Sequence, residues 1–229
     1  MKPELVLASG SPRRKELLSL ITPDFIVDKS NAEDKACLPE DLSPQDTPAY
    51  LCSLKARDVA SRHPGALIIA SDTAVFLPSK ASAKADALAD ALADARPDGP
   101  DAPDLGKDAR KAKGLLLGKP KDRQDAARLL ELLSGRAHQV ITSVHLIYGQ
   151  KERAFTQTTE VEFYPLNRQD IDWYISTNEP MDKAGAYGIQ GYGALLVKGL
   201  SGDYYTVMGL PVARLYREMK DLTGLERFD

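Results

Sequence analysis

At 229 residues, the chain is long enough for one sizeable α/β core or for two small ones. Hydrophobic residues make up 43% of it and charged residues 28%, as in an ordinary soluble globular protein. The formal net charge of −3 argues against a general nucleic-acid binder, so any phosphate-binding site must be a local basic cluster.

The sequence carries no sign of export or of a membrane segment. Residues 1–4 precede only a very short apolar run, so we expect no signal peptide, and no run approaches membrane-spanning length. Cys37 and Cys52 have neither metal nor redox spacing and are interpreted as free thiols in a reducing compartment. We therefore expect a cytoplasmic protein.

The first motif, residues 7–14 (LASGSPRR), joins an apolar run to the start of a helix. Residues 5–7 predict a buried strand, and the apolar residues of the segment 15–21 follow at helical spacing. Ser11 is suited to cap the helix, and Pro12 is suited to its first turn. A strand, a small-residue turn and a helix start together form an anion site, because free N–H groups point at the ligand.

Four polar side chains of this motif could serve such a site. Arg13 and Arg14 add forked donors suited to phosphate, and Ser9 and Ser11 supply hydroxyl groups in the turn. The alternative is an ordinary capped surface helix whose arginines are solvated, and this stretch alone does not decide between the two.

Two carboxylates stand side by side in the polar turn that follows the second predicted strand. Residues 25–27 predict that strand, and Glu33 and Asp34 end the turn. A loop tip that carries carboxylates can hold a divalent cation. The alternative is a solvated loop.

A lysine lies on the apolar side of the next predicted helix, which begins at Thr47 and Pro48. Leu51, Lys55 and Val59 are four residues apart and therefore share one face. Lys55 either snorkels to the surface from apolar neighbours or directs its ammonium into a cleft at the sheet edge.

An aspartate follows the most apolar stretch of the chain. Residues 66–70 (ALIIA) predict a strand buried on both faces, and residues 71–73 are expected to end it. Asp72 then occupies the usual place for a catalytic or metal-binding group in an α/β sheet. The alternative is a turn aspartate that caps its own backbone, but flanking apolar runs favour a functional role.

A low-complexity insertion is predicted at about residues 79–114. It is dominated by alanine, aspartate and lysine, includes three clustered prolines, and lacks the apolar content needed to pack. We expect a mobile surface loop without catalytic residues.

The second half of the chain predicts further elements and a glycine-rich loop. The elements are a helix at 124–133, a hairpin of 140–148 and 154–164, a helix at 168–176 with Trp173 in the core, a hairpin of 195–197 and 204–207, and a helix from Pro211. Four glycines between residues 185 and 193 let the backbone approach something closely. That loop matches neither a P-loop nor a dinucleotide-binding fingerprint.

Together these motifs resemble the Maf family of nucleoside triphosphate pyrophosphatases. The matching stretches follow one another along nearly the whole chain, apart from residues 78–114. They are 7–14 (LASGSPRR), 55–57 (KAR), 71–73 (SDT), 118–120 (GKP), 134–135 (SG), 179–191 (EPMDKAGAYGIQG), 202–204 (GDY) and 207–211 (VMGLP).

The resemblance implies one α/β domain over residues 1–229, of the Maf/ITPase-like kind. Such a domain has an elongated mixed sheet flanked by helices, with a central nucleotide-binding cleft. The resemblance further implies hydrolysis of a nucleoside triphosphate to the monophosphate and pyrophosphate, with a divalent metal cation such as Mg²⁺ or Mn²⁺. It also implies a homodimer that clears noncanonical or excess nucleotides.

The resemblance implies how the substrate is bound. The expected substrate-binding residues are Ser9, Ser11, Arg13, Arg14, Thr73, Lys183 and Gln190. Arg13, Thr73 and Gln190 match the positions that mark the branch of the family acting on dTTP and UTP, and Thr73 and Gln190 would read the base.

For catalysis, the resemblance implies Asp72 as the general base, as a metal ligand, or as both in turn. Lys55 and Lys119 are expected among the cations that neutralise the phosphates. Glu33 or Asp34 would complete the metal shell. The family usually has Asp-Glu at this pair, so the swapped order leaves open which carboxylate reaches the metal.

Two other functions stay open. One is a nucleotide-binding regulator of cell division without turnover. Such a sensor needs the cationic cradle but no base, so Asp72 favours the enzyme. The other is a 7-methyl-GTP pyrophosphatase, which Arg13 and Gln190 disfavour.

Overall fold

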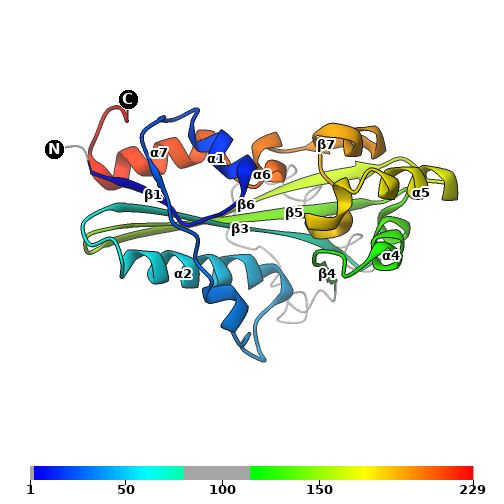
Figure 1. Ribbon diagram of the computed structural model, residues 1–229, viewed down its shortest axis with the longest axis horizontal. Coiled ribbons are helices and arrows are strands. Elements are labelled where there is room, and N and C mark those ends of the chain that lie inside the picture. Colours follow the sequence, from blue (N-terminus) through cyan, green and yellow to red (C-terminus); the bar gives the residue numbers. More distant parts are fainter. Residues whose placement is uncertain (1–2, 80–113, 229) are drawn as a thin grey trace, which may run out of the picture.

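The computed structural model describes residues 3–79 and 114–228. Within these ranges, a seven-stranded mixed sheet runs along the long axis of the molecule and has helices on both faces (Figure 1). The expected elongated α/β architecture is therefore confirmed. The predicted insertion lies outside the described residues, apart from its two end residues.

The sheet of the described residues combines parallel and antiparallel pairing. Its strand order is β2-β1-β3-β5-β6-β7, with β4 paired to β3. Pairing is parallel where β1 meets β2 and β3, and antiparallel elsewhere. The strands are β1 (Leu5–Leu7), β2 (Ile26–Val27), β3 (Leu67–Leu77), β4 (Leu115–Leu117), β5 (Ala137–Tyr148), β6 (Lys151–Phe163) and β7 (Val197–Ser201).

The helices of the described residues divide into α-helices and short 3₁₀ turns. The α-helices are α1 (Pro12–Leu18), α2 (Thr47–Ala60), α4 (Arg123–Leu133), α5 (Arg168–Ser176), α6 (Tyr204–Met208) and α7 (Val212–Thr223). The 3₁₀ turns are η1 (Ala32–Lys35), η2 (Pro44–Asp46), η4 (Glu179–Asp182), η5 (Ala184–Ala186) and η6 (Gly191–Leu196). None of these described helices has the length and apolar character needed to cross a membrane.

The middle strand β3 separates two apolar layers, as its sequence predicts. Ile68 and Ala70 pack in the same cluster as Ala56 of α2, whereas Leu67 and Ile69 pack on the opposite face with the inner residues of α7. Figure 1 shows α2 on one face of the sheet and α1, α6 and α7 on the other. Because neighbouring side chains of a strand point to opposite faces, a continuous apolar run suits this position.

The strand β3 does not end at residues 71–73, and that prediction is wrong. It continues for 11 residues, and its pairing with β5 extends without interruption from Leu67 to Phe76. The hydroxyl of Ser71 donates to the Gly209 carbonyl oxygen at 2.8 Å. Asp72 therefore lies within a continuous strand, and its buried neighbour Ser71 finds a hydrogen-bond partner in the turn that ends α6.

The prediction that Trp173 lies in the core is also wrong. Trp173 is 44% exposed, and Tyr174 is the fully buried aromatic of α5. Ile171, Tyr174 and Ile175 share the inner stripe of that helix, and Trp173 falls outside it.

The predicted hairpin of residues 195–197 and 204–207 is also wrong. Of its first run, Leu195 and Leu196 belong to η6 and only Val197 belongs to β7, which pairs with β6; its second run lies in α6. Asp203 caps α6, since its Oδ2 accepts from the Thr206 amide at 2.7 Å and from the Thr206 hydroxyl at 2.8 Å. This cap supplies hydrogen-bond acceptors to the first turn of the helix and so favours a helix over a strand at these residues.

A buried histidine joins an aromatic cluster at the far end of the sheet. The rings of His138, Phe163 and Tyr187 meet edge to face, with centroids 4.7–5.3 Å apart. The Nε2 atom of His138 lies 2.8 Å from the Tyr187 hydroxyl oxygen. Burial lowers the pKa of His138 to about 4, so the folded protein holds it neutral.

This histidine predicts a loss of stability in mild acid. An unfolded histidine has a pKa of about 6.5, so the unfolded chain takes up the proton first as the pH falls. Stability should fall as the pH drops from about 6.5 toward 4, by about 2–3 kcal/mol between pH 7 and pH 4.5. Urea unfolding of the wild type and of His138→Gln at both pH values measures this difference. Equal losses in the two proteins would contradict it.

Candidate active site

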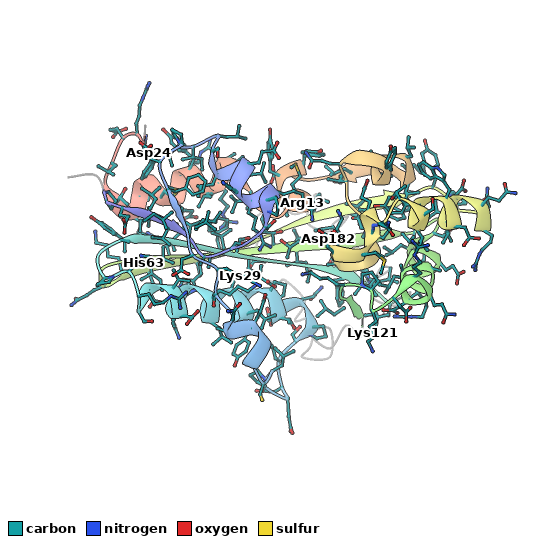
Figure 2. All side chains as sticks on the ribbon, viewed as in Figure 1. Arg13, Asp24, Lys29, His63, Lys121 and Asp182 are labelled. Carbon is teal, nitrogen blue, oxygen red and sulfur yellow. The ribbon has the colours of Figure 1, made fainter. Side chains whose placement is uncertain are left out.

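A cleft of about 610 Å³ lies against β3 and is lined from segments along the whole described chain. Figure 2 shows three of its residues, Arg13, Lys29 and Asp182, near mid-length of the molecule on separate segments. The charged residues that line it are Arg13, Arg14, Lys29, Glu33, Lys55, Asp72, Lys119, Asp182 and Lys183. Cations outnumber carboxylates there by six to three. The cleft is thus the local basic cluster that an acidic chain needs to bind phosphate.

Most of the predicted site residues meet in this cleft. Those that line it are Ser9, Ser11, Arg13, Arg14, Glu33, Lys55, Asp72, Thr73, Lys119 and Lys183. Gln190 is exposed and is not among the lining residues, although its neighbour Ile189 is. The side chain of Asp34 lies outside what the structure describes.

The guanidinium of Arg14 is held by three oxygen acceptors. Its Nε donates to the Gly209 carbonyl oxygen at 3.0 Å, its Nη1 to Ser9 Oγ at 3.2 Å and its Nη2 to Thr73 Oγ1 at 3.0 Å. Burial lowers the pKa of Arg14, and the charge of Asp72 opposes that shift. The guanidinium is therefore fixed before any ligand arrives, so binding an anion costs little ordering of this side chain.

The hydroxyl of Thr73 is occupied on both sides. Thr142 Oγ1 donates to the Thr206 carbonyl oxygen at 2.7 Å, so it accepts from Thr73 Oγ1, which lies 2.9 Å away. Thr73 in turn accepts from Arg14. Thr73 thus supports Arg14 in this structure, and its role in reading a base stays a prediction.

The central polar contact of the cleft joins Lys55 to two carboxylates. Lys55 is only 6% exposed, and its Nζ donates to Asp72 Oδ1 at 2.6 Å and forms an ion pair with Glu33 Oε2. These three residues come from α2, β3 and η1. Of the two readings of Lys55 left open by the sequence, the structure favours an ammonium directed into a cleft.

The two carboxylates around Lys55 are compatible with the binding of a divalent cation. Glu33 and Asp72 each contact the Lys55 ammonium through one oxygen, so each carboxylate keeps a second hard oxygen that could bind a cation. The described residues contain no group of three or more metal-ligating side chains. Mg²⁺ is commonly held by one or two carboxylates together with substrate phosphates and water, so two carboxylates suit it in kind and number.

The turn that carries Glu33 is anchored to α2 by a residue that the sequence did not reveal. Ser30 is 2% exposed, and its hydroxyl donates to Asp58 Oδ2 at 2.6 Å and accepts from the Ala32 amide at 3.1 Å. This hydrogen bond is the main reason why the pKa of Asp58 is lowered. The contact fixes the approach of Glu33 to Lys55.

A second residue missed by the sequence, Glu179, organises the glycine-rich loop. Its carboxylate accepts from the Tyr174 hydroxyl at 2.9 Å and from the amides of Tyr192 and Gly193 at 3.0 and 3.1 Å. A Cβ atom at Gly191 would lie 2.6 Å from Glu179 Oε2, and Gly191 has a φ of 66°. The glycines therefore let the loop wrap closely around a carboxylate of its own chain.

The comparisons with known proteins identify the family. A family model described as Maf-like protein matches residues 4–222, and the chain belongs to this family. A protein named dTTP/UTP pyrophosphatase from Bacillus velezensis is 42% identical over 221 residues, which cover 96% of this chain and 97% of that protein.

Other relatives agree with this assignment. Proteins of the same name from Halalkalibacterium halodurans and Symbiobacterium thermophilum are each 40% identical to the chain. The matches cover 96% and 92% of this chain and 96% and 90% of those proteins. The solved structure of a HAM1 protein from Coxiella burnetii has a TM-score of 0.44 at 17% identity, over 96% of this chain and 99% of that one. That likeness is too weak to add to the assignment.

The contacts of Glu179 predict that it stabilises the fold through the glycine-rich loop. In Glu179→Gln, the amide nitrogen would face a donor, so at least one hydrogen bond is lost. The free energy of unfolding should fall by about 1–3 kcal/mol. Urea denaturation measures the change, with Glu16→Gln as the control because Glu16 lies exposed on α1. Similar stability of both variants would contradict the assignment.

Proposed function

We propose that this protein hydrolyses dTTP, UTP and related pyrimidine nucleoside triphosphates to the monophosphate and pyrophosphate. The observation that carries the proposal is the basic cleft in which Lys55 holds Asp72 and Glu33 together. The relatives named dTTP/UTP pyrophosphatase support the choice of substrate, since they match the chain over nearly its whole length.

The cations of the cleft would bind the phosphate chain. Arg14 is already fixed by Ser9, Thr73 and Gly209. Arg13 and Lys119 also line the cleft, and the side chain of neither forms a hydrogen bond or ion pair within residues 3–79 and 114–228. Attack at phosphorus spreads negative charge over the phosphoryl oxygens, so positioned cations lower the barrier.

Asp72 would act on the attacking water. Its Oδ1 is engaged by Lys55, and its Oδ2 makes no hydrogen bond to the rest of the described chain. Asp72 would accept the proton of a water whose oxygen bonds to the α-phosphorus, and pyrophosphate would leave as the bridging bond breaks. A divalent cation held by Glu33 and Asp72, when bound, would neutralise phosphate charge.

Three further features belong to the proposal and are inferred from the family resemblance. They are a requirement for Mg²⁺ or Mn²⁺, a homodimeric assembly, and a cytoplasmic role in clearing noncanonical or excess nucleotides.

The proposal predicts that Asp72→Asn abolishes most turnover. Asparagine keeps an oxygen that can accept from Lys55, but it cannot take a proton, so kcat should fall by at least about 10²-fold while the fold survives. Release of pyrophosphate from dTTP measures turnover, and circular dichroism checks the fold. Asp221→Asn is the control, because Asp221 lies exposed on α7. Near-normal turnover in folded Asp72→Asn would remove Asp72 from the mechanism.

Substrate choice tests both the proposed activity and the role of Gln190. An amide side chain offers an NH₂ donor group and a carbonyl acceptor, which complement the O4/N3–H edge of uracil or thymine. The wild type should hydrolyse dTTP and UTP well and 7-methyl-GTP poorly. Gln190→Ala should reduce kcat/KM for dTTP by the equivalent of about 1–3 kcal/mol, and much less for a poor purine substrate.

The control for this panel is Gln150→Ala, in the exposed turn between β5 and β6. An equal loss for all bases would mean that Gln190 supports the loop rather than reads the base. Preference of the wild type for 7-methyl-GTP would overturn the assigned substrate class. Tight nucleotide binding without turnover would instead support a regulator.

A further inference from the structure

One cation of the cleft, Lys29, belongs to none of the sequence motifs. It lies in the turn between β2 and η1, is exposed and lines the cleft. It forms no hydrogen bond or ion pair within the described part of the chain. Figure 2 shows Lys29 and Arg13 on two different segments near mid-length of the molecule.

The backbone around Lys29 is held in place from both sides. Asp28 Oδ2 accepts from Arg62 Nε at 2.8 Å and lies 2.9 Å from His63 Nε2. Ser30 donates to Asp58 at 2.6 Å. Because both neighbours are tied to α2 and its end, Lys29 is presented from a fixed position and not from a free loop.

The aliphatic stem of Lys29 lies against the turn of the first motif. A Cβ atom added at Gly10 would lie 3.3 Å from Lys29 Cδ and 3.6 Å from its Cγ. The stem therefore packs over Gly10, which lines the cleft together with its neighbours Ser9 and Ser11. This contact places the ammonium at the cleft and explains why a small residue suits position 10.

The charge of Lys29 is also uncompensated, unlike that of two other lysines in the cleft. Lys55 is paired with Asp72 and Glu33, and Lys183 donates to Asp182 Oδ1 at 2.7 Å. Lys29 faces no such carboxylate among the described residues. A cation that is positioned but unpaired is free to contact an anionic ligand without first breaking an ion pair.

We propose that Lys29 is a further substrate-binding residue, whose ammonium contacts the phosphate chain of the nucleotide. This inference rests on the proposed function, because that function supplies the polyphosphate. The ligand class is a pyrophosphate or triphosphate group, since Lys29 presents one compact charge and no group that could read a base.

Calorimetric titration with inorganic pyrophosphate tests the proposal without requiring turnover. In Lys29→Met the apolar stem over Gly10 is kept and the charge is lost, so pyrophosphate should bind about tenfold more weakly than to the wild type. Lys29→Arg should restore most of the affinity. Lys121→Met is the matched control, because Lys121 is exposed and does not line the cleft. It should bind pyrophosphate like the wild type.

The proposal fails if Lys29→Met and Lys121→Met bind pyrophosphate within twofold of each other, or if the wild type does not bind it. Thermal unfolding of each variant checks that the fold is kept. Turnover is measured separately with dTTP. A wild type that binds pyrophosphate but hydrolyses no triphosphate would refute the proposed activity, while the comparison of variants would still decide the role of Lys29.

Discussion

The arrangement of the cleft depends on one nearly buried ammonium. Lys55 is 6% exposed, and a charge removed from water is costly unless opposite charges surround it. Asp72 and Glu33 supply those charges from two other elements. The need to pair this charge therefore holds η1, α2 and β3 close together at the cleft. Removing either carboxylate would leave the ammonium with less negative charge around it than its burial requires.

Around this contact, several polar groups are positioned by other polar groups. Ser30 and Asp58 fix the turn of Glu33, Thr73 supports Arg14, and Glu179 shapes the glycine-rich loop. The apolar clusters lie on either side of the sheet and at its far end. The polar network is thus in place without a ligand, which is compatible with a cleft that is organised before a ligand binds.

Local patterns predicted much of the fold, and together with the family resemblance they predicted most of the candidate site. The strand at residues 5–7, the helix at 168–176 and the hairpin around residue 150 follow directly from periodicity and turn residues. The contacts that support the site were not predicted, because they join residues that lie apart in the sequence. Thr73 is engaged by Arg14 and Thr142, and Glu179 accepts from amides 13 and 14 residues later, which no local pattern reveals.

The hydrogen bond from Arg14 to the carbonyl of Gly209 joins residues that are 195 positions apart. During synthesis, Arg14 therefore leaves the ribosome 195 residues before its acceptor does. A nascent chain therefore contains the first motif, residues 7–14, long before that motif has its final geometry. The same holds for any fragment that ends before residue 209, in which Arg14 would lack this acceptor and keep the freedom of an ordinary surface side chain.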